Sequence, residues 1–184
     1  MSNREEKKAA KRAEIFNVAV KLFAEHGYDN VTTAQIAAES HIAKKTLFQY
    51  FPSKEDIIFD DEDELINALL AGLDGATNIW AAFITFIQQA NAANQTDNDN
   101  HTPEAMQLPT IIRENDALNG RLLKMWDKYE RRLTDYLINL NYTNAVASAL
   151  SNTMIHVFRA TFLESADINE VITANQHVAK MILA

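Results

Sequence analysis

Cysteine is absent from this chain of 184 residues, and glycine and proline are scarce, with four and three residues. The absence of cysteine excludes a disulfide framework, thiol catalysis and metal sites built on thiolates. No run approaches the roughly 18 apolar residues of a transmembrane helix, so no membrane segment is predicted. With few residues that break helices and 47% apolar residues, the composition predicts long helices.

Charge is distributed unevenly along the chain. The first 30 residues are charged throughout, so no signal peptide is predicted and we expect a cytoplasmic protein. The net charge is −8, but residues 1–56 hold nine Lys/Arg and eight Asp/Glu, a net charge of +1, and the remainder carries −9. The N-terminal third therefore stays a candidate for binding nucleic acid, although the whole chain is acidic.

Hydrophobic spacing predicts helices along most of the chain, and no stretch alternates as strands do, so the predicted fold class is all-α. One polar stretch, residues 94–103, has the composition of a loop. The predicted helices are 9–26, 34–40, 44–51, 54–73, one that starts at residue 79, 104–115, 118–140, 143–165 and 168–183.

Local signals mark the ends of the first helices. Gly27 is predicted to end the first helix, because glycine is favoured just after a last helical turn. Thr32 and Gln35 have the spacing of a capping box at the start of the next helix. The acidic run at residues 60–64 is expected to be the solvated first half of the helix 54–73.

Two short helices joined by three residues, after a longer helix, have the size and order of a helix-turn-helix. In that motif the second short helix enters the major groove of DNA, where lysine donates to guanine and glutamine pairs with adenine. A helix N-terminus also attracts phosphate. The residues predicted to contact DNA are Thr33, Lys44, Lys45, Thr46, Phe48, Gln49, Tyr50 and Lys54.

These residues resemble the DNA-binding domain of the TetR family of transcriptional regulators. The resemblance rests on LF-x-x-x-GY at 22–28, VTTAQIA at 31–37 and KKTLFQYFPSKEDI at 44–57. It implies a three-helix DNA-binding domain at 1–56, with phosphate contacts from Thr33, Tyr50 and Lys54. Lys44, Lys45 and Gln49 are then expected to face bases or the groove.

Two residues depart from the family pattern. His41 replaces the usual turn glycine, which histidine tolerates at positive φ at a cost of about 1 kcal/mol. Phe48 replaces the usual tyrosine and lacks the hydroxyl that donates to phosphate, so its role narrows to packing or to contact with a thymine methyl group.

The resemblance also implies a helical ligand-binding and dimerisation domain at 57–184, connected to the first domain by the helix 54–73. The pattern at 108–140 is loosely similar to TetR-family members suspected of binding acyl-CoA-like ligands. Aromatic residues here are compatible with a cavity or with an ordinary core, and a lipophilic cation is an alternative effector. The residues predicted to bind a ligand are Trp80, Phe83, Met106, Arg113, Trp126, Tyr129, Phe158 and Phe162.

The helices 143–165 and 168–183 carry more small and apolar residues than one buried face requires, which predicts a homodimer and a palindromic double-stranded operator. The expected function is a regulator, most simply a repressor, released by a small apolar or amphipathic effector; activation stays open. The alternative is a helical lipid- or drug-binding protein with weak DNA binding. No enzyme, cofactor or metal site is predicted, because no catalytic or metal-binding motif occurs.

Overall fold

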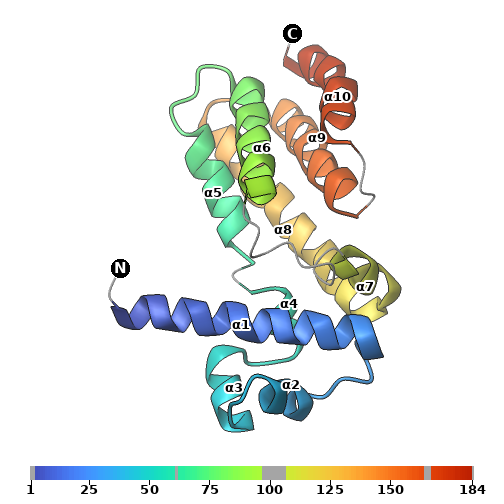
Figure 1. Cartoon of the computed structure of the whole chain (residues 1–184). Helices are drawn as coiled ribbons and strands as arrows, with labels where there is room; N and C mark the ends of the chain where they lie inside the picture. Colours follow the sequence, from blue (N-terminus) through green and yellow to red (C-terminus); the bar gives the residue numbers. More distant parts are fainter. Residues whose placement is uncertain (1–2, 61, 97–106, 164–166, 184) are drawn as a thin grey trace. The chain divides into compact units, whose positions relative to one another are not determined.

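The computed structural model describes residues 3–60, 62–96, 107–163 and 167–183. These residues form helices and no strand, which confirms the all-α class (Figure 1). None of the helices described is both long enough and apolar enough to cross a bilayer. The helices are α1 (Asn3–His26), α2 (Thr33–Glu39), α3 (Lys44–Tyr50), α4 (Glu55–Ile58), α5 (Glu64–Leu73), α6 (Ile79–Thr96), α7 (Leu108–Glu114), α8 (Asp116–Asn139), α9 (Asn144–Leu163) and α10 (Ile168–Leu183).

The chain divides into two compact units. The first comprises Met1–Asp61 and Asn98–Leu118, and the second comprises Glu62–Asp97 and Asn119–Ala184. The predicted domain boundary lies between residues 56 and 57. The division between the units falls a few residues later, and α7 joins the first unit.

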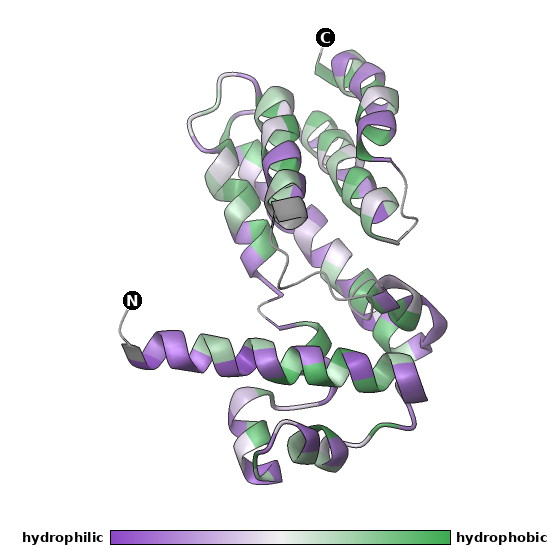
Figure 2. Ribbon diagram, in the orientation of Figure 1, coloured by the Kyte–Doolittle hydropathy of each residue, from purple (hydrophilic) through white to green (hydrophobic). Residues whose placement is uncertain are grey.

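One apolar face of α1 organises the first unit. Ile15, Ala19 and Phe23 recur every four residues and are buried, as their spacing predicts. Hydrophobic residues accordingly recur along the C-terminal half of α1 (Figure 2). Helix α1 packs against α2, α4 and α7. The same core contains Val31, Ile36, Leu47, Phe51 and Ile57.

Helix α1 begins at Asn3, earlier than the predicted residue 9. Glu5 and Glu6 lie in its first turn, where carboxylates interact favourably with the helix dipole. The lysines, arginines and alanines that follow are strong helix formers. The helix ends where predicted: Gly27 has a φ of 82° and its N–H donates to the Phe23 carbonyl at 2.9 Å.

The predicted continuous helix 54–73 is wrong, because the chain forms α4 and α5 with a break between them. Consecutive carboxylates at residues 60–64 repel one another along a helix. Asp60 instead pairs with Arg12 of α1, and the Glu62 carbonyl accepts a hydrogen bond from the Tyr129 hydroxyl. Asp60, Glu62 and Asp63 therefore have partner side chains, and the acidic run is not the start of one continuous helix.

Arg12 joins three parts of the first unit. Its Nε atom donates to the Asp60 carboxylate at 2.9 Å, and its Nη2 atom donates to the other oxygen of the same group. Its Nη1 atom donates to the carbonyl of Tyr50, the last residue of α3, at 2.9 Å. The guanidinium also lies 4.6 Å from the centre of the Phe51 ring.

Aromatic side chains fill the core of the second unit. Phe83 of α6 meets Phe158 of α9 edge to face at 5.7 Å between ring centres. Trp126 of α8 stacks on Phe158 at 6.2 Å and contacts Tyr129 at 5.5 Å. Helix α5 packs on α6, and α9 packs on α10.

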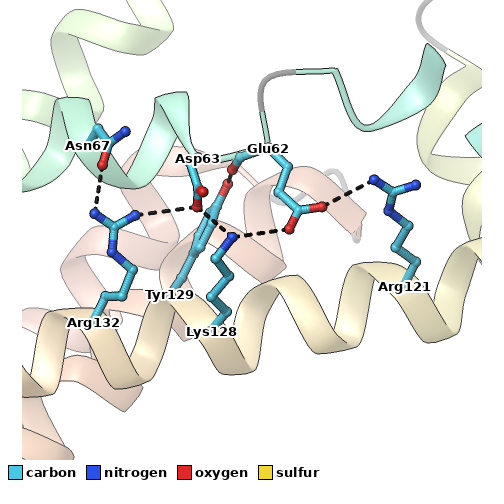
Figure 3. Close-up of polar contacts among 7 residues, drawn as sticks. All are labelled: Glu62, Asp63, Asn67, Arg121, Lys128, Tyr129 and Arg132. Carbon is cyan, nitrogen blue, oxygen red and sulfur yellow. Dashed lines mark hydrogen bonds and ion pairs between the residues drawn. The ribbon is translucent and has the colours of Figure 1, made fainter. Parts of the chain in front are cut away.

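A network of ion pairs connects the start of α5 to α8 (Figure 3). Glu62 binds Arg121 at 3.4 Å and Lys128 at 3.3 Å, and Asp63 binds Lys128 at 2.7 Å. The hydrogen bond from Lys128 is the largest cause that lowers the pKa of Asp63, and Asp63 in turn raises the pKa of Lys128. Burial raises the pKa of Tyr129 to about 12, so its hydroxyl stays a donor at neutral pH.

Replacement of Arg12 by glutamine is expected to lower the free energy of unfolding by about 2–3 kcal/mol, because it leaves the Asp60 carboxylate and the Tyr50 carbonyl without their cation. Urea unfolding measures this change. The control is Lys21→Gln, an exposed lysine on the same helix, which should shift stability by no more than about 0.5 kcal/mol. Equal stability of the two variants would contradict the role given to Arg12.

Candidate functional site

Helices α2 and α3 form the helix-turn-helix that the sequence predicts. Thr32 caps α2: its hydroxyl accepts from the Gln35 N–H at 3.2 Å, and the Gln35 side chain accepts from the Thr32 N–H at 2.8 Å. This reciprocal pair is the predicted capping box. Ile36 and Leu47 are buried, so the two helices share one core with α1.

The turn between the two helices depends on a left-handed residue. His41 has a φ of 54°, which confirms the positive φ expected at this position. The turn is closed by the Ile42 N–H, which donates to the Ala37 carbonyl at 2.9 Å. Lys11 of α1 donates to the Ser40 carbonyl at 3.0 Å and so holds the end of α2.

The outer face of α3 is exposed. Lys44, Lys45 and Gln49 lie at the surface, and Phe48 is 43% exposed. The Lys44 ammonium lies 5.8 Å from the centre of the Phe48 ring. The N-cap residue Ala43 supplies no side-chain hydrogen bond to the first turn. The face therefore presents two cations, an amide and an aromatic ring.

Three further residues predicted to contact DNA, Thr33, Thr46 and Tyr50, are half-buried. Thr33 is the first residue of α2, and Tyr50 is the last residue of α3. Thr46 and Tyr50 line one groove together with Gln49. Their contacts with DNA stay predictions, because no nucleic acid is present.

Lys54, which is predicted to contact a phosphate, is half-buried. Its ammonium donates to the carbonyls of Tyr28 at 2.7 Å and Val31 at 3.0 Å, and it lies 3.9 Å from the Tyr28 ring centre. Burial lowers the pKa of Lys54, while the charges of Asp29 and Glu55 act in the opposite direction. Lys54 thus holds the segment that leads into α2, and a phosphate would compete with these carbonyls for its ammonium.

The second unit contains a mainly apolar cavity of about 270 Å³. It lies among five helices, α5, α6, α8, α9 and α10. The buried indole nitrogen of Trp126, a residue of the lining, has no hydrogen-bond partner among the described residues. The lining consists of Leu65, Ile87, Ala90, Asn91, Trp126, Phe158, Thr161, Phe162 and Ile168.

Three of the residues predicted to bind a ligand line this cavity: Trp126, Phe158 and Phe162. Trp80, Phe83 and Tyr129 are buried in the surrounding core. Arg113 lies in the first unit, whereas the cavity belongs to the second. Met106 lies outside the described residues.

The remaining lining residues were missed by sequence reasoning, which looked for aromatic side chains. Leu65, Ile87 and Ile168 look like ordinary core positions in the sequence, and no local signal separates them from the rest of the core. Three cations near the start of α1, Arg4, Lys7 and Lys8, were also missed; they line the same groove as Thr46, Gln49 and Tyr50.

Comparison with known proteins connects the helix-turn-helix to one family. Residues 15–60 match the family model described as bacterial regulatory proteins, tetR family. The transcriptional regulator HbdR of Aromatoleum sp. (strain CIB) is 43% identical over 49 residues, which cover 27% of this chain and 21% of that protein. The aligned segments span only 15% to 46% of the curated relatives that match, so the similarity concerns part of each protein.

Solved structures share the fold along nearly the whole chain. A Syntrophomonas wolfei protein assigned to the TetR family of transcriptional regulators superposes with a TM-score of 0.64 and 16% identity, over 100% of this chain and 97% of that one. The regulator FadR of Bacillus subtilis, solved with stearoyl-CoA, gives a TM-score of 0.55 and 16% identity, over 93% and 97%. At these identities the similarity establishes the fold alone.

Replacement of His41 by glycine is expected to raise the free energy of unfolding by about 0.5–1 kcal/mol, because glycine adopts a positive φ without strain. Urea unfolding checks this change. The control Ala38→Gly, in the adjoining helix α2, should lower stability by about 1 kcal/mol. A loss of stability in both variants would show that the turn is not strained at His41.

Proposed function

We propose that this chain, whose residues 15–60 match the TetR family of bacterial regulatory proteins, is a transcriptional regulator that binds an operator through α3 and responds to a small-molecule effector. The observation that carries this proposal is the outer face of α3, where Lys44, Lys45, Phe48 and Gln49 are exposed over a buried inner face. An α-helix fits the major groove, where such side chains reach base edges.

Each exposed residue of α3 has a different partner in the groove. The lysines donate to guanine acceptors or to phosphates, and the Gln49 amide matches the donor and acceptor of adenine. Phe48 can form no polar contact with DNA. Its exposed ring suits the methyl group of thymine, so we expect thymine in the half-site where Phe48 meets the bases.

A homodimer through α9 and α10 is part of the proposal. On α10, Ala174, Val178 and Met181 are exposed at helical spacing, and Met181 is 61% exposed. On α9, Ala145 and Ala149 are exposed one turn apart. Small residues let helices approach closely, and a second copy would cover this apolar surface. Two copies of α3 would then read a palindrome.

The effector is proposed to occupy the cavity of the second unit. A volume of about 270 Å³ lies near the lower limit of the roughly 300–1,000 Å³ range of ligand sites, so it favours a compact apolar or amphipathic molecule. Trp126, Phe158 and Phe162 supply the aromatic part of the lining, which suits an apolar chain. The acyl-CoA bound by the FadR structure suggests a fatty acyl chain as the first class to test.

Selection of bound duplexes from a random pool is expected to enrich a palindrome with half-sites about one helical turn apart. The K44A/K45A variant should bind the selected duplex at least about tenfold more weakly, because each lysine contact with a base is worth about 1–3 kcal/mol. Affinities are measured by fluorescence anisotropy at two salt concentrations.

The matched control is Lys124→Ala, an exposed lysine on α8, which should retain the affinity of the unaltered protein. Unchanged affinity of K44A/K45A for the selected duplex would contradict operator binding through α3. If protein freed of copurified ligands enriches no duplex at either salt concentration, the chain is instead a helical binder of small molecules with weak DNA binding, which its cavity also suits.

The chain contains two tryptophans, so Trp80→Phe leaves Trp126 as the only indole. In this variant, fatty acids and acyl-CoA esters are expected to change Trp126 fluorescence, because Trp126 lines the cavity, and affinity should rise with chain length until the cavity is filled. Each buried CH2 group contributes about 0.8 kcal/mol, or roughly fourfold in affinity. The converse variant Trp126→Phe keeps only Trp80, which is not part of the lining, and should give a smaller change. Trp126 fluorescence that responds to none of these ligands would contradict an effector site in this cavity.

A further inference from the structure

The start of α1 carries a stripe of positive charge. Arg4, Lys7, Lys8 and Lys11 occur at i, i+3, i+4 and i+7, which is one face of an α-helix. The acids Glu5 and Glu6 fall outside that face at 100° per residue. Because α1 begins at Asn3, these cations belong to a regular helix.

Three cations of this stripe line a groove of about 390 Å³ together with residues of α3, here called the α1–α3 groove. Its lining has two sides, both within the first unit. Arg4, Lys7 and Lys8 come from α1, and Thr46, Gln49 and Tyr50 come from α3.

The cations of the stripe differ in what they bind. Lys11 is occupied by Glu14 at 2.7 Å and by the Ser40 carbonyl at 3.0 Å. Arg4, Lys7 and Lys8 are exposed, and none of them forms an ion pair with a carboxylate of the described residues. Like charges three and four residues apart repel, and cations near a helix N-terminus oppose its dipole. Such an arrangement is stabilised by an anionic partner.

We propose that the α1–α3 groove binds the sugar–phosphate backbone of DNA beside the bases that α3 reads. This inference rests on the proposed function. DNA is favoured over other polyanions because the groove is continuous with the reading helix: Gln49 and Tyr50 belong both to its lining and to the predicted DNA contacts. Phosphate contacts fix the register of a protein on the duplex without reading its sequence.

Each phosphate contact releases counterions, so it steepens the dependence of binding on salt. The logarithm of the binding constant falls with the logarithm of salt concentration by about 0.9 for each phosphate neutralised. Two contacts, from Lys7 and Lys8, therefore contribute about 1.8 to that slope for each half-site. Between about 50 and 200 mM salt they account for roughly 12-fold of the loss in affinity.

The test compares K7Q/K8Q with K21Q/K124Q, which removes the same charge from exposed lysines outside the groove. Binding to the duplex selected by the unaltered protein is measured across a salt series. K7Q/K8Q is expected to bind more weakly with a salt slope lower by about 1.8 for each half-site and an unchanged base preference. K21Q/K124Q should match the unaltered protein, and circular dichroism should give the same helix content for all three.

Uncharged methylphosphonate linkages test the position of the contact. Placed singly along the selected duplex, they should weaken binding by the unaltered protein at a phosphate flanking the half-site and leave K7Q/K8Q unaffected there. If the salt slope is unchanged in K7Q/K8Q while the unaltered protein still selects a palindrome, the α1–α3 groove does not bind DNA phosphates. The proposed function is then unaffected. If the unaltered protein selects no duplex, both fail. If K7Q/K8Q loses affinity for polyphosphate but not for DNA, the groove binds another anion.

Discussion

The run of five acidic residues at 60–64 is the constraint on which both units depend. Carboxylates at this density disfavour one continuous helix, because like charges one turn apart repel by about 0.2–0.5 kcal/mol per pair. Asp60 is neutralised by Arg12 in the first unit, and Glu62 and Asp63 are neutralised by cations of α8 in the second (Figure 3). The break between α4 and α5 agrees with this distribution of charge.

The cations of the first unit fall into two groups. Lys11, Arg12 and Lys54 donate to backbone carbonyls and fix the end of α2, the end of α3 and the segment before α2. The exposed lysines, among them Lys44 and Lys45, donate to no backbone carbonyl of the described residues. Arg12 of the first group holds the end of α3 through the Tyr50 carbonyl, while the second group stays exposed and able to meet an anion.

Local chemistry explains what the sequence could predict. The capping box at Thr32, the helix stop at Gly27 and the positive φ of His41 depend on residues a few positions apart, and all three occur. The break near residue 60 could not be predicted, because it depends on Arg12 and Tyr129, which lie 48 and 67 residues away from their partners. For the same reason the contacts of Lys54 with the Tyr28 and Val31 carbonyls could not be predicted. The cavity lining combines five helices, so no single segment of sequence marks it.

Thermodynamic linkage joins the two proposed ligands. If an effector in the cavity weakens binding to DNA, DNA must weaken binding of the effector by the same factor, typically 5- to 150-fold. The mainly apolar lining gives a physical basis for effector choice, since each CH2 group that a ligand buries contributes about 0.8 kcal/mol. An effector shifts an equilibrium only by the difference between its affinities for the two states. The apolar surface that the effector buries must therefore differ between the DNA-bound protein and the released protein.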